Sequence, residues 1–297
     1  MPSSKLKTQN SALHIGTAGW NYRDWAGNFY PEGTSDSKEM LDEYVKHFKT
    51  VELDSTFYGI PRPSTVADWH ERTPADFIFA AKFPRIITHD KKLFDAQQET
   101  DEFLTTMAAL GAKMGPFVLQ FPYSFKPTEE NYAALENYLA ALPPTTAADK
   151  QDAVHPYRYA VEVRHKGWLD DKLYNILRFH NIALALTSSD APWMPRYLDV
   201  ATADFVYIRW LGDLQEPIPV RDRSEELQKW AEIAKKLLAE EHEVWGYFNN
   251  QWAGHAPSSA EEFIKLVNAL CRSTIPGTTT STTNGGRRAA PAACCTR

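Results

Sequence analysis

The segment TVELDSTFYGIP, residues 50–61, carries the densest group of side chains that could do chemistry. Glu52 and Asp54 are two residues apart, so their carboxylates share one face of a strand. Val51 and Leu53, on the opposite face, favour burial. A buried carboxylate is costly unless it is paired, hydrogen-bonded or reactive. The segment therefore predicts a functional site at the end of a buried strand.

Polar residues also close most of the other strand-like runs. They are Trp20 and Asn21–Trp25, Lys82, Gln120, Glu162 with Arg164 and His165, Arg209, and Asn249 with Asn250. Because side chains alternate along a strand, Lys82 shares a face with Ile78 and Ala80. In the same way Gln120 shares a face with Val118, and Glu162 and Arg164 share a face with Ala160. The other faces are apolar and suit a layer of helices; they hold Phe79, Leu119, Phe121, Val161 and Val163.

Two chemical interpretations fit this polar set. In the first, an anion clamp is formed by Lys82, Arg164 and Arg209. Glu52 and Glu162 then orient these cations or act as acid and base. In the second, the two glutamates flank a glycosidic bond. A structural alternative is a salt-bridge network that merely fills the interior. The first predicts Glu52, Glu162 and Lys82 as catalytic residues.

Metal ligation is not expected. The carboxylates Glu52, Asp54 and Glu162 are accompanied by three cations that would repel a metal ion, and the histidines do not cluster by motif. The sequence therefore predicts a site without metal or cofactor.

Aromatic side chains follow several strand ends: Trp20, Tyr22, Trp25, Tyr58, Trp168 and Trp252. Each one taken singly favours a packing role, but together they suggest a site for flat or sugar-like faces.

Short apolar runs alternate with helix-periodic segments along the chain. The expected strands are 13–20, 50–57, 77–84, 117–122, 159–165, 182–188, 205–212 and 243–250. The expected helices are 38–48, 64–72, 100–114, 129–142, 170–181, a poorly defined segment after Trp193, 224–240 and 258–271, with Ser64, Ser224 and Ser258 as N-caps. Eight alternations predict an α/β fold, a single-domain TIM-type (β/α)8 barrel with its site at the carboxyl ends of the strands. A doubly wound sheet is the alternative, but GTAGW at residues 16–20 lacks the spacing of a dinucleotide fingerprint.

Composition narrows the class of protein. The 297 residues are 43% hydrophobic, with 32 Lys and Arg against 38 Asp and Glu, so a net charge of -6 gives no general attraction to nucleic acid or anionic membranes. No segment is apolar enough to span a bilayer. We expect a flexible tail at 1–12, the barrel at 13–272 and a disordered tail at 273–297 that holds Cys294 and Cys295. The few cysteines favour a reducing compartment. The sequence therefore predicts that the protein lies in the cytoplasm, with the nucleus as the alternative location.

Long motifs resemble the domain of unknown function family 72, the YecE-like proteins. They include GTAGWNYRDWAGNFYPEG, VELDSTFYGIPRPSTVADWHERTPADFIFAAKFPRIITHD, FVLQFP, AVEVRHKGW and YFNNQWAGHAPSSA. The resemblance implies a TIM-type barrel and no established reaction. Two positions depart from the family pattern: Asp54 stands where an Asn is usual, and Leu211 stands where a histidine is usual. A mechanism that needs that histidine is therefore in doubt for this chain.

These observations predict a metal-independent enzyme acting on a phosphorylated, sugar-like or nucleotide-like molecule. The expected substrate-binding residues are Trp20, Tyr22, Trp25, Asp54, Thr56, Tyr58, His89, Gln120, Arg164, Trp168, Arg209, Asn249 and Asn250. The alternative is a non-catalytic nucleotide or nucleic-acid binding protein, which the acidic net charge disfavours. The sequence makes no prediction about oligomeric state.

Overall fold

The computed structural model describes residues 13–143, 157–191, 194, 200–212 and 220–272. The expected tails, 1–12 and 273–297 with Cys294 and Cys295, lie outside the described residues.

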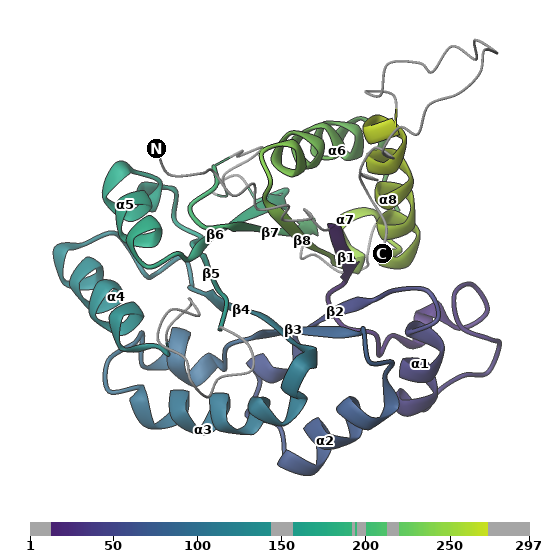
Figure 1. Cartoon of the computed structure of the whole chain (residues 1–297), viewed down its shortest axis with the longest axis horizontal. Coiled ribbons are helices and arrows are strands. Elements are labelled where there is room, and N and C mark those ends of the chain that lie inside the picture. Colours follow the sequence, from purple (N-terminus) through teal and green to yellow (C-terminus); the bar gives the residue numbers. More distant parts are fainter. Residues whose placement is uncertain (1–12, 144–156, 192–193, 195–199, 213–219, 273–297) are drawn as a thin grey trace, which may run out of the picture.

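Eight parallel strands surround a central axis (Figure 1). They are β1 (Leu13–Thr17), β2 (Thr50–Leu53), β3 (Ile78–Lys82), β4 (Met114–Gln120), β5 (Tyr159–Glu162), β6 (Ala183–Ser189), β7 (Phe205–Gly212) and β8 (Glu243–Phe248). Neighbours pair in the order β1-β8-β7-β6-β5-β4-β3-β2. The predicted α/β barrel is confirmed.

The seam between β1 and β2 closes the barrel with little pairing. Ala18 and Glu52 form an isolated bridge, and the backbone N–H of Gly19 donates to the carbonyl of Glu52 at 2.8 Å. A Cβ on Gly16 would lie 2.2 Å from the carbonyl oxygen of Thr50. Glycine at this position therefore allows the two strands to approach.

The helices lie outside the strands (Figure 1). They are α1 (Ser37–Tyr44), α2 (Pro63–Arg72), α3 (Gln97–Met107), α4 (Glu129–Ala141), α5 (Asp171–Phe179), α6 (Ser224–Ala239), the short α7 (Asn250–Ala253) and α8 (Ala256–Arg272). The described residues between β6 and β7 contain no helix, and the segment expected after Trp193 lies largely outside them.

Several expected boundaries are wrong. Strand β2 ends at Leu53 and is followed by a 3-10 helix, Ser55–Phe57. Helix α3 ends at Met107, and a further 3-10 helix with a kink at Gly111 leads into β4. None of the three serines is an N-cap. Helix α2 starts at Pro63, whose ring fixes a helical φ, Ser224 is the first residue of α6 with Arg223 as the N-cap, and α8 already begins at Ala256.

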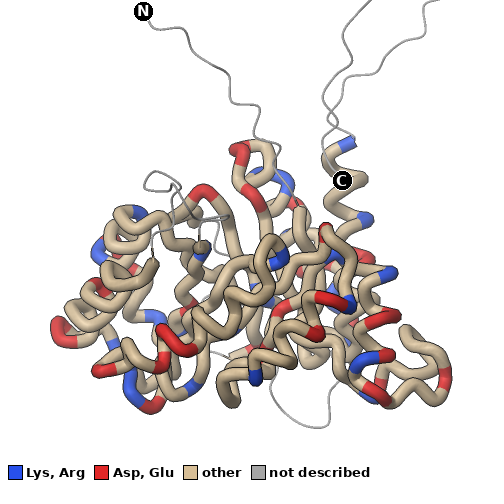
Figure 2. The backbone as a smooth tube through the Cα atoms, turned by 60° about the horizontal axis from the view of Figure 1, so that its bottom comes forward, with Lys and Arg blue, Asp and Glu red and all other residues tan. Residues whose placement is uncertain are grey.

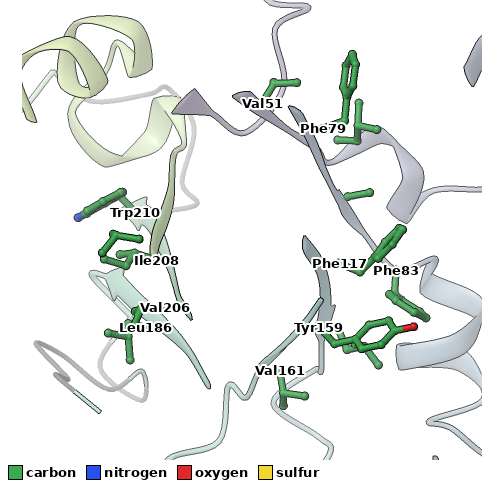
Figure 3. Close-up of a cluster of buried hydrophobic side chains, with 14 of the residues drawn as sticks. Val51, Phe79, Phe83, Phe117, Tyr159, Val161, Leu186, Val206, Ile208 and Trp210 are labelled. Carbon is green, nitrogen blue, oxygen red and sulfur yellow. The ribbon is translucent and has the colours of Figure 1, made fainter. Parts of the chain in front are cut away.

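Alternate strand residues form two separate cores, as the alternation predicts. The outward residues pack against the helices, and Figure 3 shows Val51, Phe79, Val161 and Ile208 among them. The inward residues form a second cluster: Ala80, Val118, Ala160, Ala183, Ala185, Phe205, Tyr207, Trp245 and Tyr247. This inner cluster fills the lumen below the polar strand ends.

Charged residues of both signs are interspersed over the helices and loops in Figure 2. None of the helices in the described part of the chain is long and apolar enough to cross a membrane.

Candidate functional site

A polar layer lies directly above the apolar cluster of the lumen. Most of its members follow an inward apolar or aromatic residue by two positions, as Lys82 follows Ala80 and Arg209 follows Tyr207, and therefore share its face. The layer consists of Glu52, Lys82, Gln120, Glu162, Thr187 and Arg209, all buried, with Asn249 half-buried beside them. The barrel thus brings together residues from seven strand ends.

Arg209 joins the two glutamates. Its Nε and Nη2 donate to Oε1 of Glu52 at 3.1 and 2.6 Å, and its Nη1 donates to Oε2 of Glu162 at 2.5 Å. The Tyr207 hydroxyl donates to Oε2 of Glu52 at 2.6 Å. All three guanidinium nitrogens are therefore in use, and a guanidinium occupies the space in which two glutamates would flank a glycosidic bond.

The charges in this network stabilise one another. Burial alone would raise the pKa of Glu162, but Arg209 and Arg164 outweigh it and hold that pKa at about 2. Burial would lower the pKa of Arg209, whereas Glu52 and Glu162 raise it well above its usual value. Burial and the neighbouring Glu52 raise the pKa of Tyr207, which therefore remains a hydrogen-bond donor.

Lys82 and Asp54 lie on the outer side of this network. Lys82 Nζ is 3.2 Å from Oδ1 of Asp54 and 3.9 Å from the centre of the Phe57 ring. The Thr56 hydroxyl is within hydrogen-bond distance of the Lys82 and Leu53 carbonyls, at 2.6 and 2.7 Å, and ties the ends of β2 and β3 together. Thr56 is buried and positions Lys82 rather than reaching the mouth.

Arg164 leaves most of its guanidinium unused. Its Nε donates to Oε1 of Glu162 at 3.0 Å, and its side chain is 22% exposed. Nη1 and Nη2 have no hydrogen-bond partner among the described residues. Arg164 therefore presents a pair of free donors at the mouth, unlike Arg209.

His89 and Gln120 line the β3 and β4 side of the mouth. His89 Nδ1 is 2.9 Å from the Thr88 hydroxyl, and its ring packs edge-on against Phe57. Burial, together with the cations Lys82 and Arg164, lowers the pKa of His89 to about 4, so its imidazole is neutral at pH 7. Gln120 Nε2 donates to the Phe121 carbonyl at 2.7 Å.

Two tyrosines lie at the opening on the β1 and β2 side. The Tyr22 hydroxyl donates to the Ala18 carbonyl at 2.7 Å, and burial together with Asp54 and Glu52 raises its pKa. Tyr58 is 82% exposed on the loop after β2.

Other predicted binding residues are packed away from the opening. Trp20, Trp25 and Trp168 are buried, and their indole N–H groups donate to the Ser37 carbonyl, to Oδ1 of Asn250 and to the Phe125 carbonyl. Asn250 is buried and also accepts from the Ala256 backbone. Trp252 is likewise buried and donates to Ser188. These residues stabilise the loops that carry the site.

Sequence reasoning missed three residues of the site. Tyr207 and Thr187 lie on strands for which alternation was not applied, and the same alternation would have placed both in the lumen. Phe57 forms the aromatic surface under Lys82. Thr187 Oγ1 and Asn249 Oδ1 are buried and have no hydrogen-bond partner among the described residues.

The part of the chain that the structure describes contains no group of three or more His, Cys, Asp or Glu arranged to hold a metal ion. Its inward carboxylates instead alternate with guanidinium and ammonium groups.

The model of the family described as "Protein of unknown function DUF72" matches residues 14–282. The chain belongs to this family. The DUF72 protein of Thermotoga maritima is 27% identical, with a TM-score of 0.71 over 86% of this chain and 99% of that one. The DUF72 protein of Enterococcus faecalis is 22% identical, with a TM-score of 0.66 over 88% and 99% of the two chains.

Two curated relatives carry names without an activity. The UPF0759 protein YecE of Escherichia coli is 35% identical over 153 residues, which is 52% of this chain and 48% of that protein. The matched region thus spans about half the length of YecE. The UPF0759 protein YunF of Bacillus subtilis is 24% identical over 286 residues, covering 86% of this chain and 95% of YunF.

The two residues expected to depart from the family pattern lie at or next to this site. Asp54 supplies the carboxylate beside Lys82, where an amide would leave the ammonium without its counter-ion. Leu211 is buried near the end of β7, two residues after Arg209. This chain therefore has no histidine at that position.

Proposed function

We propose that this protein is a metal-independent enzyme acting on an anionic, sugar-like or nucleotide-like small molecule at the carboxyl end of the barrel. The observation that carries the proposal is the division of the cations into two classes. Arg209 is fully occupied by buried glutamates, whereas Arg164 has two unused donor groups and Lys82 contacts one carboxylate.

Arg164 and Lys82 are suited to binding the anionic group. A guanidinium edge with two parallel N–H donors matches a phosphate or carboxylate, and an ammonium adds a point charge. Thr187, Asn249 and Gln120 offer further polar atoms for hydroxyl groups. The exposed Tyr58 provides an aromatic surface at the rim.

Glu52 and Glu162 serve mainly as positioning residues in this proposal. Both carboxylates are fully buried and held by Arg209, and Glu162 also orients Arg164. The proton-transferring groups are then Lys82 and Asp54, which lie closer to solvent.

Anion binding can be tested with inorganic phosphate. Titration should raise the thermal midpoint of the wild-type chain, because a ligand that binds only the folded state stabilises it. Arg164→Gln and Lys82→Gln should each abolish the rise. Arg85→Gln is the matched control, since Arg85 is exposed after the same strand β3 and pairs with Asp90. An equal rise in all four proteins would overturn the assignment of the anion site.

Catalysis can be tested by incubating the chain with sugar phosphates and nucleotides in the presence of a chelator. Turnover that persists with chelator and disappears in Lys82→Gln supports a metal-independent enzyme. Turnover that requires an added divalent cation contradicts it. Unchanged turnover in Glu162→Gln would remove the positioning role of that glutamate.

The exposed aromatics around the mouth support one alternative, a non-catalytic binding protein for nucleic acid. Tyr58, Phe94 and Tyr123 are exposed on the loops after β2, β3 and β4. Binding through phosphates would weaken steeply with added salt. Absence of single-stranded DNA or RNA binding at low salt would eliminate this alternative.

A further inference from the structure

The two buried lysines among the described residues differ in their surroundings. Lys113 Nζ donates to the His70 carbonyl, to the Thr73 carbonyl at 2.6 Å and to the Thr73 hydroxyl at 3.2 Å. Each of its three protons therefore has an acceptor. Lys82 Nζ has one carboxylate 3.2 Å away and an aromatic ring below it. Lys113 is a structural lysine, and Lys82 is held without its full set of hydrogen bonds.

The environment of Lys82 makes its ammonium easier to deprotonate than that of an exposed lysine. Burial is the largest influence and lowers the pKa of Lys82, and Arg209 lowers it further, while Asp54, Glu162 and Glu52 oppose both. Lys82 is the last residue of β3, so its nitrogen lies at the carboxyl end of the barrel, where a substrate would enter. Once deprotonated, an amine in that place is a nucleophile.

We propose that Lys82 forms an imine with its substrate, and that the substrates of this site therefore carry an aldehyde or ketone group. This inference rests on the proposed function, because it uses the same mouth and assigns the anionic group of the substrate to Arg164. It adds the electrophilic class of the substrate and a covalent step.

The covalent step balances without an oxidant or a reductant. The Lys82 ammonium gives one proton to solvent, and the nitrogen lone pair forms a bond to the carbonyl carbon. The carbonyl oxygen takes up protons, the C–O bond breaks, and the oxygen leaves as water. The net change converts an ammonium and a carbonyl into a protonated imine and water. The resulting positive charge remains next to Asp54, which stabilises it.

Reductive trapping tests this proposal on the full chain. Dihydroxyacetone phosphate is the probe, dihydroxyacetone is its uncharged counterpart, and sodium cyanoborohydride converts any imine to a stable secondary amine. Peptide mapping by mass spectrometry then gives the extent of labelling at each lysine at pH 7. We expect labelling at Lys82 to exceed that at the exposed Lys38 and Lys46 severalfold, because a lowered pKa leaves a larger fraction of the amine neutral at pH 7.

A charge substitution separates a nucleophile from a structural lysine. Since Asp54 raises the pKa of Lys82, Asp54→Asn should move the pH profile of Lys82 labelling to lower pH. The exposed Lys38 and Lys46 in the same sample serve as internal controls, whose profiles should not move. Because labelling is also mapped in the wild-type chain, the test does not depend on folding of a variant.

The outcomes distinguish the two proposals. Labelling at Lys82 that equals labelling of the surface lysines, or an unshifted profile in Asp54→Asn, overturns the imine. If phosphate binds but Lys82 is not labelled, the anion site is supported and the imine is contradicted. If the charged and the uncharged probe label Lys82 to the same extent, and Arg164→Gln does not change this, the imine is supported and the anion site is contradicted.

Discussion

Arg209 is the residue on which the polar layer depends. It lies between two fully buried glutamates, from β2 and β5, and forms an ion pair with each. Burying two carboxylates costs several kcal/mol, and only a well-placed partner offsets that cost. Arg164 differs because its side chain reaches solvent and makes one hydrogen bond to the described part of the chain. The two arginines should therefore respond very differently to substitution.

Replacement of Arg209 by leucine should destabilise the protein by about 3–5 kcal/mol, because two buried carboxylates lose their partner. Urea denaturation measures this loss as a lower midpoint. Arg164→Gln is the matched control. It should lower the free energy of unfolding by no more than about 1 kcal/mol, because Glu162 remains paired with Arg209. Equal effects of the two substitutions would contradict the proposed division between a structural and a ligand-binding arginine.

Acid should weaken the fold through Glu162. Its pKa is about 2 in the folded chain against 4.5 for a free side chain, so the unfolded chain binds its proton first as the pH falls. The stabilisation is complete above about pH 4.5, is lost between about pH 4.5 and about pH 2, and is of the order of 3 kcal/mol.

The measurement is the difference in unfolding free energy between wild type and Glu162→Gln across this range. The difference is needed because His14 and His89, both with pKa values lowered to about 4 largely by burial, also make stability fall as the pH drops from about 6.5 to about 4. Parallel curves for the two proteins below about pH 4.5 would show that Glu162 is not ionised and paired in the folded state.

Among the elements, the seam between β1 and β2 controls the position of Glu52. The bridge at this seam involves Glu52 itself, whose carbonyl accepts from Gly19. Gly16 permits the approach, since any side chain there would meet the Thr50 backbone. The geometry of the site thus depends on the absence of one Cβ atom.

Gly16→Ala should force the seam apart and destabilise the protein by about 1–3 kcal/mol, the usual effect of overpacking. It should also weaken phosphate binding, because the pairing of Glu52 with Arg209 is displaced. Gly59→Ala is the control, as no atom lies within 4 Å of a Cβ there and the loop is exposed. Thermal midpoints and phosphate titrations check both variants; a stable Gly16→Ala chain with normal binding would refute the role of the seam.

At the scale of the whole molecule, the barrel confines six charges to one end of its lumen. Glu52, Asp54 and Glu162 balance Lys82, Arg164 and Arg209, although the chain as a whole carries a net charge of -6. A TIM barrel normally fills these layers with branched apolar residues. A residue retained there against its desolvation cost, without a full set of partners, indicates selection for function rather than stability.

Lys82→Met should therefore leave the free energy of unfolding within about 1 kcal/mol of wild type, or raise it, because a buried ammonium is removed and Asp54 is solvated. Imine labelling and turnover should be lost. Lys113→Met is the matched control and should destabilise by about 1–3 kcal/mol, since it leaves buried carbonyls without a donor. Denaturation curves measure the unfolding free energy of both variants. A larger loss of stability in Lys82→Met than in Lys113→Met would show that Lys82 is a structural residue.

The sequence by itself determined the eight strands, most of the helices between them, and the face on which Lys82, Gln120, Glu162 and other polar strand residues lie. These are local properties, since the period of a strand and the burial of apolar residues are set by near neighbours. Boundaries at Leu53 and Met107 were not predictable in this way, because short 3-10 helices continue the apolar pattern beyond the end of each element.

Only the tertiary structure decided which charges pair. Tyr207 and Arg209 meet Glu52 across more than 150 residues of chain, and this contact exists only because the barrel closes. The same closure buries Trp20, Trp25 and Trp168 under the loops, so these aromatic residues do not line the opening. Pairing depends on distances and desolvation set by the closed barrel, and local sequence carries no information about either.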